Sequence, residues 1–270
     1  DPQGRVTAIN IRKRRFSDAG LARIKGLKHV QQISLRGTKI TGDGLALLAG
    51  FSRLREVWID QTQVDDTGLK NLGRLRSLRK ILARKCRVTL PGIVALSQTV
   101  PRVEVFFSGG RLQAGRLELD PPLVEADIAS LRGASNIRVL DLAGLSVGDT
   151  ALTILKDLPA LSELVLSNSR ITNTGLRRIS ELAGLQALDL SGTRLTDSGL
   201  APLAKLTNLK SLKLARIPLT NAGVVHLSGL TGLHRLSLAG TQIGGNALRH
   251  LSRLTSLTIL DLSDTPVTNN

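Results

Sequence analysis

The sequence predicts an α/β solenoid, a stack of similar units that each contain a strand, a turn and a helix. Three observations support this fold class. The sequence repeats itself in 24-residue units. Within each unit the spacing of apolar residues changes from the period of a strand to that of a helix. Aromatic residues make up only 2% of the 270 residues, with no Tyr and no Met, which indicates a core of Leu, Ile, Val and Ala in one repeated slot.

The 24-residue unit is clearest in the second half of the chain. The unit that begins at Leu185 reads LQALDLSGTRLTDSGLAPLAKLTN, and the units at Leu209 and Leu233 follow the same pattern. Further units begin at Val6, Val30, Leu54, Leu78, Ile137 and Leu161, and a partial unit begins at Leu257.

The apolar positions of one unit predict its strand and its helix. Leu188 and Leu190 alternate with polar or small residues, which is the spacing of a strand. Leu200, Leu203 and Leu206 follow at intervals of three, which suits one face of a helix. We therefore expect each unit to hold a short strand and a helix of about two to three turns.

The start of each helix has a capping signal. At the twelfth position of the unit stands a residue whose side-chain oxygen can accept a backbone N–H: Ser17, Thr41, Asp65, Thr89, Thr172, Thr196 and Thr220, with Gly148 and Gly244 as exceptions. Acids follow directly, where the helix dipole favours a negative charge, at Asp18, Asp66, Asp149 and Asp197.

A small residue recurs three positions past the cap. It is found at Gly20, Gly44, Gly68, Gly92, Ala151, Gly175, Gly199, Gly223 and Ala247. Because glycine costs a helix about 1 kcal/mol, its repeated use predicts that the helix start packs too closely for a larger side chain.

A small hydroxyl or thiol recurs at the turn after the strand. The position is occupied by Thr38, Thr62, Cys86, Ser169, Thr193, Thr241 and Thr265. Such a side chain can bond to backbone groups that are buried in the turn. Arg14, Leu145 and Ile217 break the pattern, so the turn geometry is expected to differ there.

The pattern LxxLxLxxTxLTDxGLxxLxxLxx resembles a leucine-rich repeat. It is similar to the 24-residue bacterial type with Thr at the turn, which is related to the cysteine-containing subclass. The resemblance covers nearly the whole chain except about 100–136. It implies a curved arc with a parallel β-sheet on the concave face and α-helices on the convex face. Strands stack about 4.8 Å apart, whereas helix axes need roughly 8–10 Å, which favours the same curvature.

The period fails between Val100 and Ile137, where the spacing is 37 residues instead of 24. The segment VEVFFSGGRLQAGRLELDPPL holds two alternating runs around Gly109-Gly110. We interpret 100–136 as one irregular repeat with a hairpin-like insertion, and two degenerate repeats are the alternative. The chain would then be one continuous solenoid with an N-terminal arm at 1–99 and a C-terminal arm at 137–270.

The chain is strongly basic and the charge is unevenly distributed. Its 37 Lys and Arg residues exceed its 21 Asp and Glu residues by 16, a balance that attracts anionic partners. Residues 1–136 hold 24 basic and 12 acidic side chains, a net charge of +12, whereas residues 137–270 hold 13 and 9, a net charge of +4.

Side chains that alternate with the buried residues of each strand are expected on the concave face. In the C-terminal arm they are mostly Ala and Ser, whereas in the N-terminal half they are basic or aromatic. Arg and Trp are favoured anchors of protein interfaces. The candidate partner-binding residues are Arg12, Lys13, Arg15, Arg36, Lys39, Trp58, Asp60, Lys80, Arg84, Lys85, Arg87, Phe106 and Phe107.

The sequence predicts no catalytic residue, no metal ligand set and no cofactor. His226 and His250 share one helix position, but no further zinc ligand recurs beside them. Asp141 and Asp189 are expected roughly 10 Å apart on the concave face, as polar decoration. Cys86 occupies a turn position, where burial is expected.

We therefore predict a non-enzymatic scaffold that binds a protein partner, mainly on the basic N-terminal half. One alternative is binding of an anionic polymer, of which acidic glycan is favoured over nucleic acid because aromatics are few. Another is the substrate-recognition arm of a larger enzyme, such as a ubiquitin-ligase-type effector. A monomer is expected.

The chain has no signal-peptide pattern and no apolar run of about 18 residues. It ends inside a repeat and lacks an initiator Met, so we expect a fragment of a longer protein. The compartment is left open, with the cell envelope and the exterior as candidates.

Overall fold

The computed structural model describes residues 3–12, 15–121, 123 and 125–268. The chain divides into two compact units, unit 1 at Asp1–Glu118 and unit 2 at Leu119–Asn270. The boundary lies inside the segment 100–136, where the repeat period fails. The division into arms 1–99 and 137–270 around that segment stays a prediction.

Unit 1 alternates strands with helices and ends in a hairpin. Its elements are β1 (Ala8–Asn10), α1 (Asp18–Arg23), β2 (Gln32–Ser34), the 3₁₀ helix η1 (Gly44–Gly50), β3 (Glu56–Trp58), α2 (Asp66–Leu72), β4 (Lys80–Ala83), α3 (Leu90–Thr99), β5 (Glu104–Phe107) and β6 (Gly110–Gln113), with β7 (Arg116–Leu119) at the boundary. From β1 to β5 each strand pairs in parallel with the next, at a constant offset of one repeat. β6 then pairs antiparallel with β5, with Phe106 opposite Arg111.

Unit 2 continues the same alternation. Its elements are α4 (Glu125–Ala129), β8 (Val139–Asp141), η2 (Asp149–Asp157), β9 (Glu163–Val165), α5 (Asn173–Ile179), β10 (Ala187–Asp189), η3 (Asp197–Lys205), β11 (Ser211–Lys213), α6 (Asn221–Val224), η4 (Val225–Leu227), β12 (Arg235–Ser237), η5 (Gly245–Ala247), α7 (Leu248–Leu251) and β13 (Ile259–Asp261). From β8 to β13 each strand pairs in parallel with the next, again in a register shifted by one repeat.

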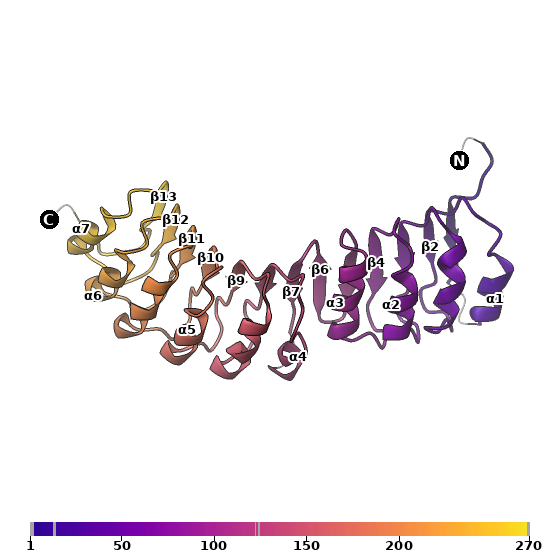
Figure 1. Ribbon diagram of the computed structural model, residues 1–270, viewed down its shortest axis with the longest axis horizontal. Helices are drawn as coiled ribbons and strands as arrows, with labels where there is room; N and C mark the ends of the chain where they lie inside the picture. The colour runs from indigo at the N-terminus through magenta and orange to yellow at the C-terminus, as the bar shows by residue number, and fades with distance from the viewer. Residues whose placement is uncertain (1–2, 13–14, 122, 124, 269–270) are drawn as a thin grey trace. The chain divides into compact units, whose positions relative to one another are not determined.

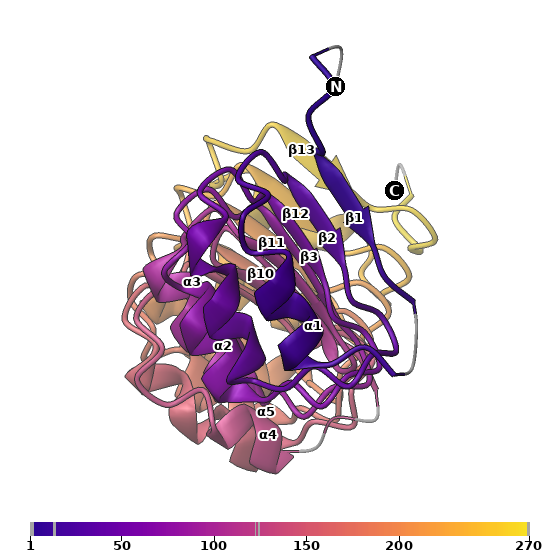
Figure 2. The ribbon, with the colours of Figure 1, turned by 90° about the vertical axis from the view of Figure 1, so that its right-hand side faces the viewer.

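Within each unit the strands form one layer and the helices form another (Figure 1). The end view in Figure 2 shows β1, β2 and β3 on one side of unit 1 and α1, α2 and α3 on the other. The core lies between the layers and is mainly aliphatic, with Phe51 and Phe107 as buried aromatics. Ile33 and Leu35 from the strand side and Leu45 and Leu48 from the helix side are all 0% exposed. The predicted strand–turn–helix unit with a parallel sheet is confirmed.

Several of the expected α-helices are 3₁₀ helices instead. η2 and η3 are nine residues long, and η3 contains Pro202. A 3₁₀ helix rises about 2.0 Å per residue and an α-helix about 1.5 Å. The tighter helix therefore covers the length of the unit with fewer residues, which suits a repeat of only 24.

Neighbouring repeats are joined at their helix starts by a three-residue contact, which we call the clasp. Asp66 Oδ1 accepts the backbone N–H of Thr89 at 2.8 Å, and Asp66 Oδ2 accepts the Thr89 hydroxyl at 2.5 Å. A Cβ on Gly92 would lie 2.1 Å from Asp66 Oδ1. The acid after one cap therefore binds the cap of the next repeat, and the glycine makes room for it.

The clasp recurs along the chain with small changes. Asp18 with Thr41 and Gly44, Asp149 with Thr172 and Gly175, and Asp197 with Thr220 and Gly223 repeat it. Asn173 takes the place of the acid before Thr196 and Gly199. This confirms that the helix starts are too close for a side chain. The acids after the caps also bind the cap residue of the next repeat, a contact that the helix-dipole argument did not predict.

A variant of the clasp joins α4 to η2 in unit 2. Glu125 accepts the hydroxyl of Thr150 and, at 2.9 Å, the backbone N–H of Gly148. These two hydrogen bonds, that from Thr150 first, lower the pKa of the Glu125 carboxyl. The longer side chain reaches the cap of the next repeat where the cap residue is Gly148 itself, which has no hydroxyl to offer.

The turn hydroxyls bond to the backbone as predicted. Thr38, Thr62, Thr193 and Thr241 each donate to the carbonyl three residues earlier, at 2.5 to 2.7 Å. Ser169 differs, since its Oγ is buried without a hydrogen bond to any described residue.

The residue before the turn hydroxyl has a left-handed backbone in every regular repeat of the described chain outside the first. Glycine occupies that position in some repeats, but Gln61, Lys85, Asn168, Arg216 and Asp264 do so with φ of 55° to 59°. Such a backbone costs a non-glycine residue about 1–2 kcal/mol. In those five repeats the strained backbone lowers the stability of the folded chain, and an exposed polar side chain stands at the edge of the sheet.

Candidate functional site

The side of the sheet that faces away from the helices, which we call the strand face, is the predicted binding surface. On the strand face of unit 1, registered residues form a row across β1 to β6: Asn10, Ser34, Trp58, Leu82, Phe106 and Arg111. Trp58, Leu82 and Phe106 are half-buried and lie on three adjacent strands. Because neighbouring strands lie about 4.8 Å apart, these three side chains form a continuous partly exposed apolar row.

Three cations surround the ring of Phe106. Lys80 Nζ lies 5.3 Å from the ring centroid, Arg84 Cζ lies 5.7 Å from it and Arg111 Cζ lies 5.4 Å from it. These distances are within the range in which the ring face attracts a cation. Lys80 lies on β4 and Arg84 directly follows that strand on one side, and Arg111 lies on β6 on the other. Arg111 also forms a 2.5 Å ion pair with Glu104.

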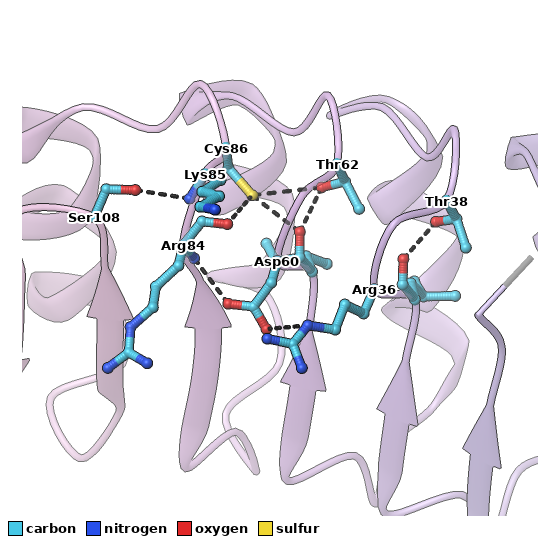
Figure 3. Close-up of polar contacts among 10 residues, drawn as sticks. Arg36, Thr38, Asp60, Thr62, Arg84, Lys85, Cys86 and Ser108 are labelled. Atoms are coloured by element: carbon cyan, nitrogen blue, oxygen red, sulfur yellow. Dashed lines mark hydrogen bonds and ion pairs between the residues drawn. The ribbon is translucent and has the colours of Figure 1, made fainter. Parts of the chain in front are cut away.

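Asp60 organises the polar contacts beside the apolar row (Figure 3). Its Oδ2 lies 3.7 Å from Arg36 Nε, and its Oδ1 accepts the backbone N–H of Arg84 at 3.0 Å. The residue is only 3% exposed, so these two contacts compensate for the burial of its carboxylate. Directly after β5, the Ser108 hydroxyl accepts the backbone N–H of Lys85 at 2.7 Å. Asp60 thus contacts the side chain of Arg36 and the backbone of Arg84.

Most of the predicted site residues have accessible side chains. Trp58, Lys80 and Phe106 are half-buried on the strand face. The exposed residues are Arg12, Arg15, Arg36, Lys39, Arg84, Lys85 and Arg87. The last group extends beyond the strand face to the edge where the strands end, because Arg15, Lys39 and Arg87 follow the turns.

Two predicted site residues are placed differently by the structure. Phe107 is 7% exposed and belongs to the core, because it pairs with Ala83 on the inward-facing side of the sheet. Asp60 is on the strand face but buried, so it holds other site residues in position and offers little surface. Lys13 lies outside the described residues.

Two residues of this surface were absent from the predicted set. Leu82 stands between Ile81 and Ala83, and a run of three apolar residues hides which one faces outward. The parallel register of β4 with β3 and β5 resolves this by aligning Leu82 with Trp58 and Phe106. Arg111 reaches Phe106 only because β6 folds back antiparallel onto β5, and no repeat position predicts that contact.

The strand face of unit 2 has a different character. Small residues, among them Ser167, Ser191, Ala215 and Ala239, line a shallow hollow of about 410 Å³. Charged residues border it, including Asp189, which lies 3.6 Å from Lys213 Nζ. The predicted contrast between a bulky N-terminal surface and a small-residue C-terminal surface is present in the structure.

The aspartates that share a strand position in unit 2 have a structural role. Asp141, Asp189 and Asp261 each accept the backbone N–H of the residue two positions later, at 3.0 to 3.1 Å. Asp261 also accepts hydroxyl hydrogen bonds from Ser263 and Ser237. These bonds, that from the Ser263 hydroxyl first, lower the pKa of the Asp261 carboxyl. The carboxylates therefore close the turn that follows each strand.

Cys86 is half-buried at its turn position, less buried than expected. Its Sγ lies 2.9 Å from the carbonyl oxygen of Ile59 and 3.5 Å from the Thr62 hydroxyl (Figure 3). Burial raises the pKa of the Cys86 thiol, and the hydrogen bond from Thr62 opposes that effect only in part. The geometry is that of a turn hydroxyl replaced by a thiol.

Within the described part of the chain, no cluster of three or more His, Cys, Asp or Glu side chains is arranged to hold a metal ion. Across the same residues, none of the helices has the length and apolar character needed to cross a membrane.

Comparison with known proteins points to one repeat family. A family model described as Leucine Rich repeat matches residues 185–204. None of the curated proteins compared with the sequence matches it. The finer subclass with Thr at the turn stays a prediction.

Similar solved structures come from bacteria and animals. An internalin from Listeria monocytogenes is 19% identical, with 91% of this chain and 78% of that chain covered and a TM-score of 0.45. The mouse RP105/MD-1 complex is 18% identical, with 98% of this chain and 43% of that chain covered and a TM-score of 0.55. The chain therefore spans less than half the length of the mouse protein. At this identity the likeness to the mouse structure shows the fold alone.

Proposed function

We propose that this chain, whose repeats resemble leucine-rich repeats, is a non-catalytic scaffold that binds a protein partner on the strand face of unit 1. The observation that carries the proposal is the partly exposed row of Trp58, Leu82 and Phe106 on three adjacent strands. Aromatic side chains with arginines beside them are the residue types that most often dominate protein interfaces. Stacked repeats also offer an extended surface, which suits a large partner.

The electrostatic setting of the row supports a specific contact. Arg36 is held by Asp60 and Arg111 by Glu104, so their guanidinium groups are positioned before any partner arrives. Side chains that are already ordered lose less conformational entropy on binding. A preorganised surface of this kind favours a defined partner over unspecific adhesion.

The test removes the anchors without disturbing the buried network. The double variant Trp58→Ala with Arg84→Ala keeps Asp60 bonded, because the Arg84 contact to Asp60 is through the backbone. Partner capture from native lysate should fall by roughly 100-fold or more, as expected when two anchors are lost. The measurement is quantitative pull-down with the full chain as bait.

The matched control changes two exposed cations on the helix side of the same unit. Lys70→Ala with Arg74→Ala should leave capture unchanged, since both residues lie away from the strand face. Equal capture by the wild type and the strand-face variant would show that the assigned surface is wrong.

A second candidate function is binding of an anionic polymer. The observation that favours it is the line of exposed cations at the edge where the strands of unit 1 end, among them Arg15, Lys39, Lys85 and Arg87. Such a line presents charge without apolar anchors, which suits an acidic glycan chain.

A further inference from the structure

Positive charge is concentrated in and around β4. Residues 79–87 contain five basic side chains and no acid. Two of them, Lys80 and Arg84, flank Leu82 on the same side of the strand, because residues two apart share a face. Neither forms an ion pair with any residue in the described part of the chain.

Three cations lie close to the ring of Phe106. Lys80 Nζ, Arg84 Cζ and Arg111 Cζ lie 5.3, 5.7 and 5.4 Å from its centroid. Among these three cations, only Arg111 has a carboxylate partner within the described residues. The ring attracts each cation but cancels none of the charge. Two cations that form no ion pair within the described residues are therefore held at one ring beside an apolar surface, and an anion that docks between them relieves their repulsion.

The acids of the same face decide what kind of anion fits. Glu56 on β3 and Glu104 on β5 are both registered opposite Lys80, so carboxylates flank β4 on both sides. A polymer with a negative charge on every unit would meet them as well as the cations. A polypeptide can place a few carboxylates over β4 and an uncharged side chain elsewhere.

We infer that the segment bound at this surface is an acidic polypeptide stretch with an apolar side chain among its carboxylates. The carboxylates pair with Lys80 and Arg84, and the apolar side chain lies on Leu82 and Trp58. This inference rests on the proposed function and names the chemistry of the partner.

The test uses defined peptides and the full chain. The probe is a dye-labelled short peptide in which glutamate and leucine alternate. One control peptide has glutamine in place of glutamate, and another contains glutamate alone. Fluorescence anisotropy measures each dissociation constant. The alternating peptide should bind at least about tenfold more tightly than either control.

Two charge-reversal variants locate the binding. Lys80→Glu with Arg84→Glu should weaken binding of the alternating peptide by about tenfold or more. Lys70→Glu with Arg74→Glu makes the same change of net charge on the helix side and should leave the constant unaltered. Circular dichroism checks that both variants fold, and Lys80→Gln with Arg84→Gln replaces the first variant if it does not.

The outcomes separate this inference from the scaffold itself. Equal binding of the glutamine peptide overturns the acidic character of the partner and leaves the scaffold intact. Equal binding of the all-glutamate peptide, or equal weakening by the two reversals, overturns the inference in favour of a general polyanion surface. Absence of binding by every peptide also overturns it, and lysate capture with Trp58→Ala/Arg84→Ala then decides separately whether the surface binds a protein.

Discussion

Single residues in unit 1 divide into those that offer surface and those that hold it in place. Trp58 and Phe106 are partly exposed, whereas Asp60 is buried and positions Arg36 and the backbone of Arg84. Removal of Asp60 would leave the part-buried backbone N–H of Arg84 without its acceptor, which costs about 0.5–1.5 kcal/mol. Loss of binding after that change would therefore report on structure as much as on contact.

Cys86 is expected to be a slow nucleophile. The thiolate is the reactive form, and burial raises the pKa of this thiol above its ordinary value, so less thiolate is present at a given pH than in the unfolded chain. Alkylation by iodoacetamide at pH 8 should therefore be slower than in the unfolded chain, by about fivefold. The rate is measured by mass spectrometry, and in the folded chain it should rise only at a higher pH than in the unfolded chain. Equal rates in the folded and the unfolded chain at pH 8 would contradict the assigned environment.

At the scale of elements, the clasp explains how adjacent helices stay in register. Each clasp acid bonds to the backbone N–H and the hydroxyl of the next cap, and each clasp glycine leaves room for that acid. Repeat proteins are stable through such contacts between neighbours. The same three positions therefore cap a helix and join two repeats.

A double-mutant cycle tests the clasp at Asp66 and Gly92. Asp66→Ala should lower the free energy of unfolding by about 0.5–1.5 kcal/mol, because the exposed Thr89 N–H loses its acceptor and is hydrated instead. Gly92→Ala should cost about 1–3 kcal/mol, because its Cβ would clash with the Asp66 carboxylate. In the Asp66→Ala background the added methyl group has space. The double variant should then be no less stable than Asp66→Ala alone.

Urea denaturation followed by circular dichroism measures this cycle. Asp43→Ala is the matched control, since Asp43 is an exposed acid in the same unit, and its effect should stay within about 0.5 kcal/mol. Strictly additive effects of Asp66→Ala and Gly92→Ala would show that the two residues do not interact.

At the scale of the whole molecule, the charge is concentrated more sharply than the repeat pattern alone indicates. Unit 1 holds 23 basic and 9 acidic residues, a net charge of +14, whereas unit 2 holds 14 and 12, a net charge of +2. The long-range attraction for anionic partners therefore comes mainly from unit 1, which also carries the apolar row of Trp58, Leu82 and Phe106.

A salt titration on an anionic matrix measures how strongly the net positive charge alone retains the chain. If an anionic polymer is the ligand, the chain should stay on heparin or single-stranded DNA at about 100 mM salt, where the screening length is roughly 10 Å. Arg15→Glu with Lys39→Glu should then elute earlier, while Trp58→Ala should elute with the wild type. Elution of the wild type below that salt concentration would exclude the polymer as the main ligand.

The repeat period determined the fold, the parallel register and the crowding at the helix starts. It could do so because each repeat contacts only its neighbours, so one unit of sequence specifies its own surroundings. The same logic found Trp58, Lys80, Arg84 and Phe106, since their positions follow from alternation within a strand.

Only the tertiary structure decided what lies where the period fails. β6 folds back antiparallel onto β5 and brings Arg111 to Phe106. The parallel pairing of β5 with β4 places Phe107 beside Ala83 on the core side of the sheet. The register of β4 likewise aligned Leu82 with Trp58 and Phe106. A contact across strands depends on pairing and register, and a sequence reveals these only where it repeats.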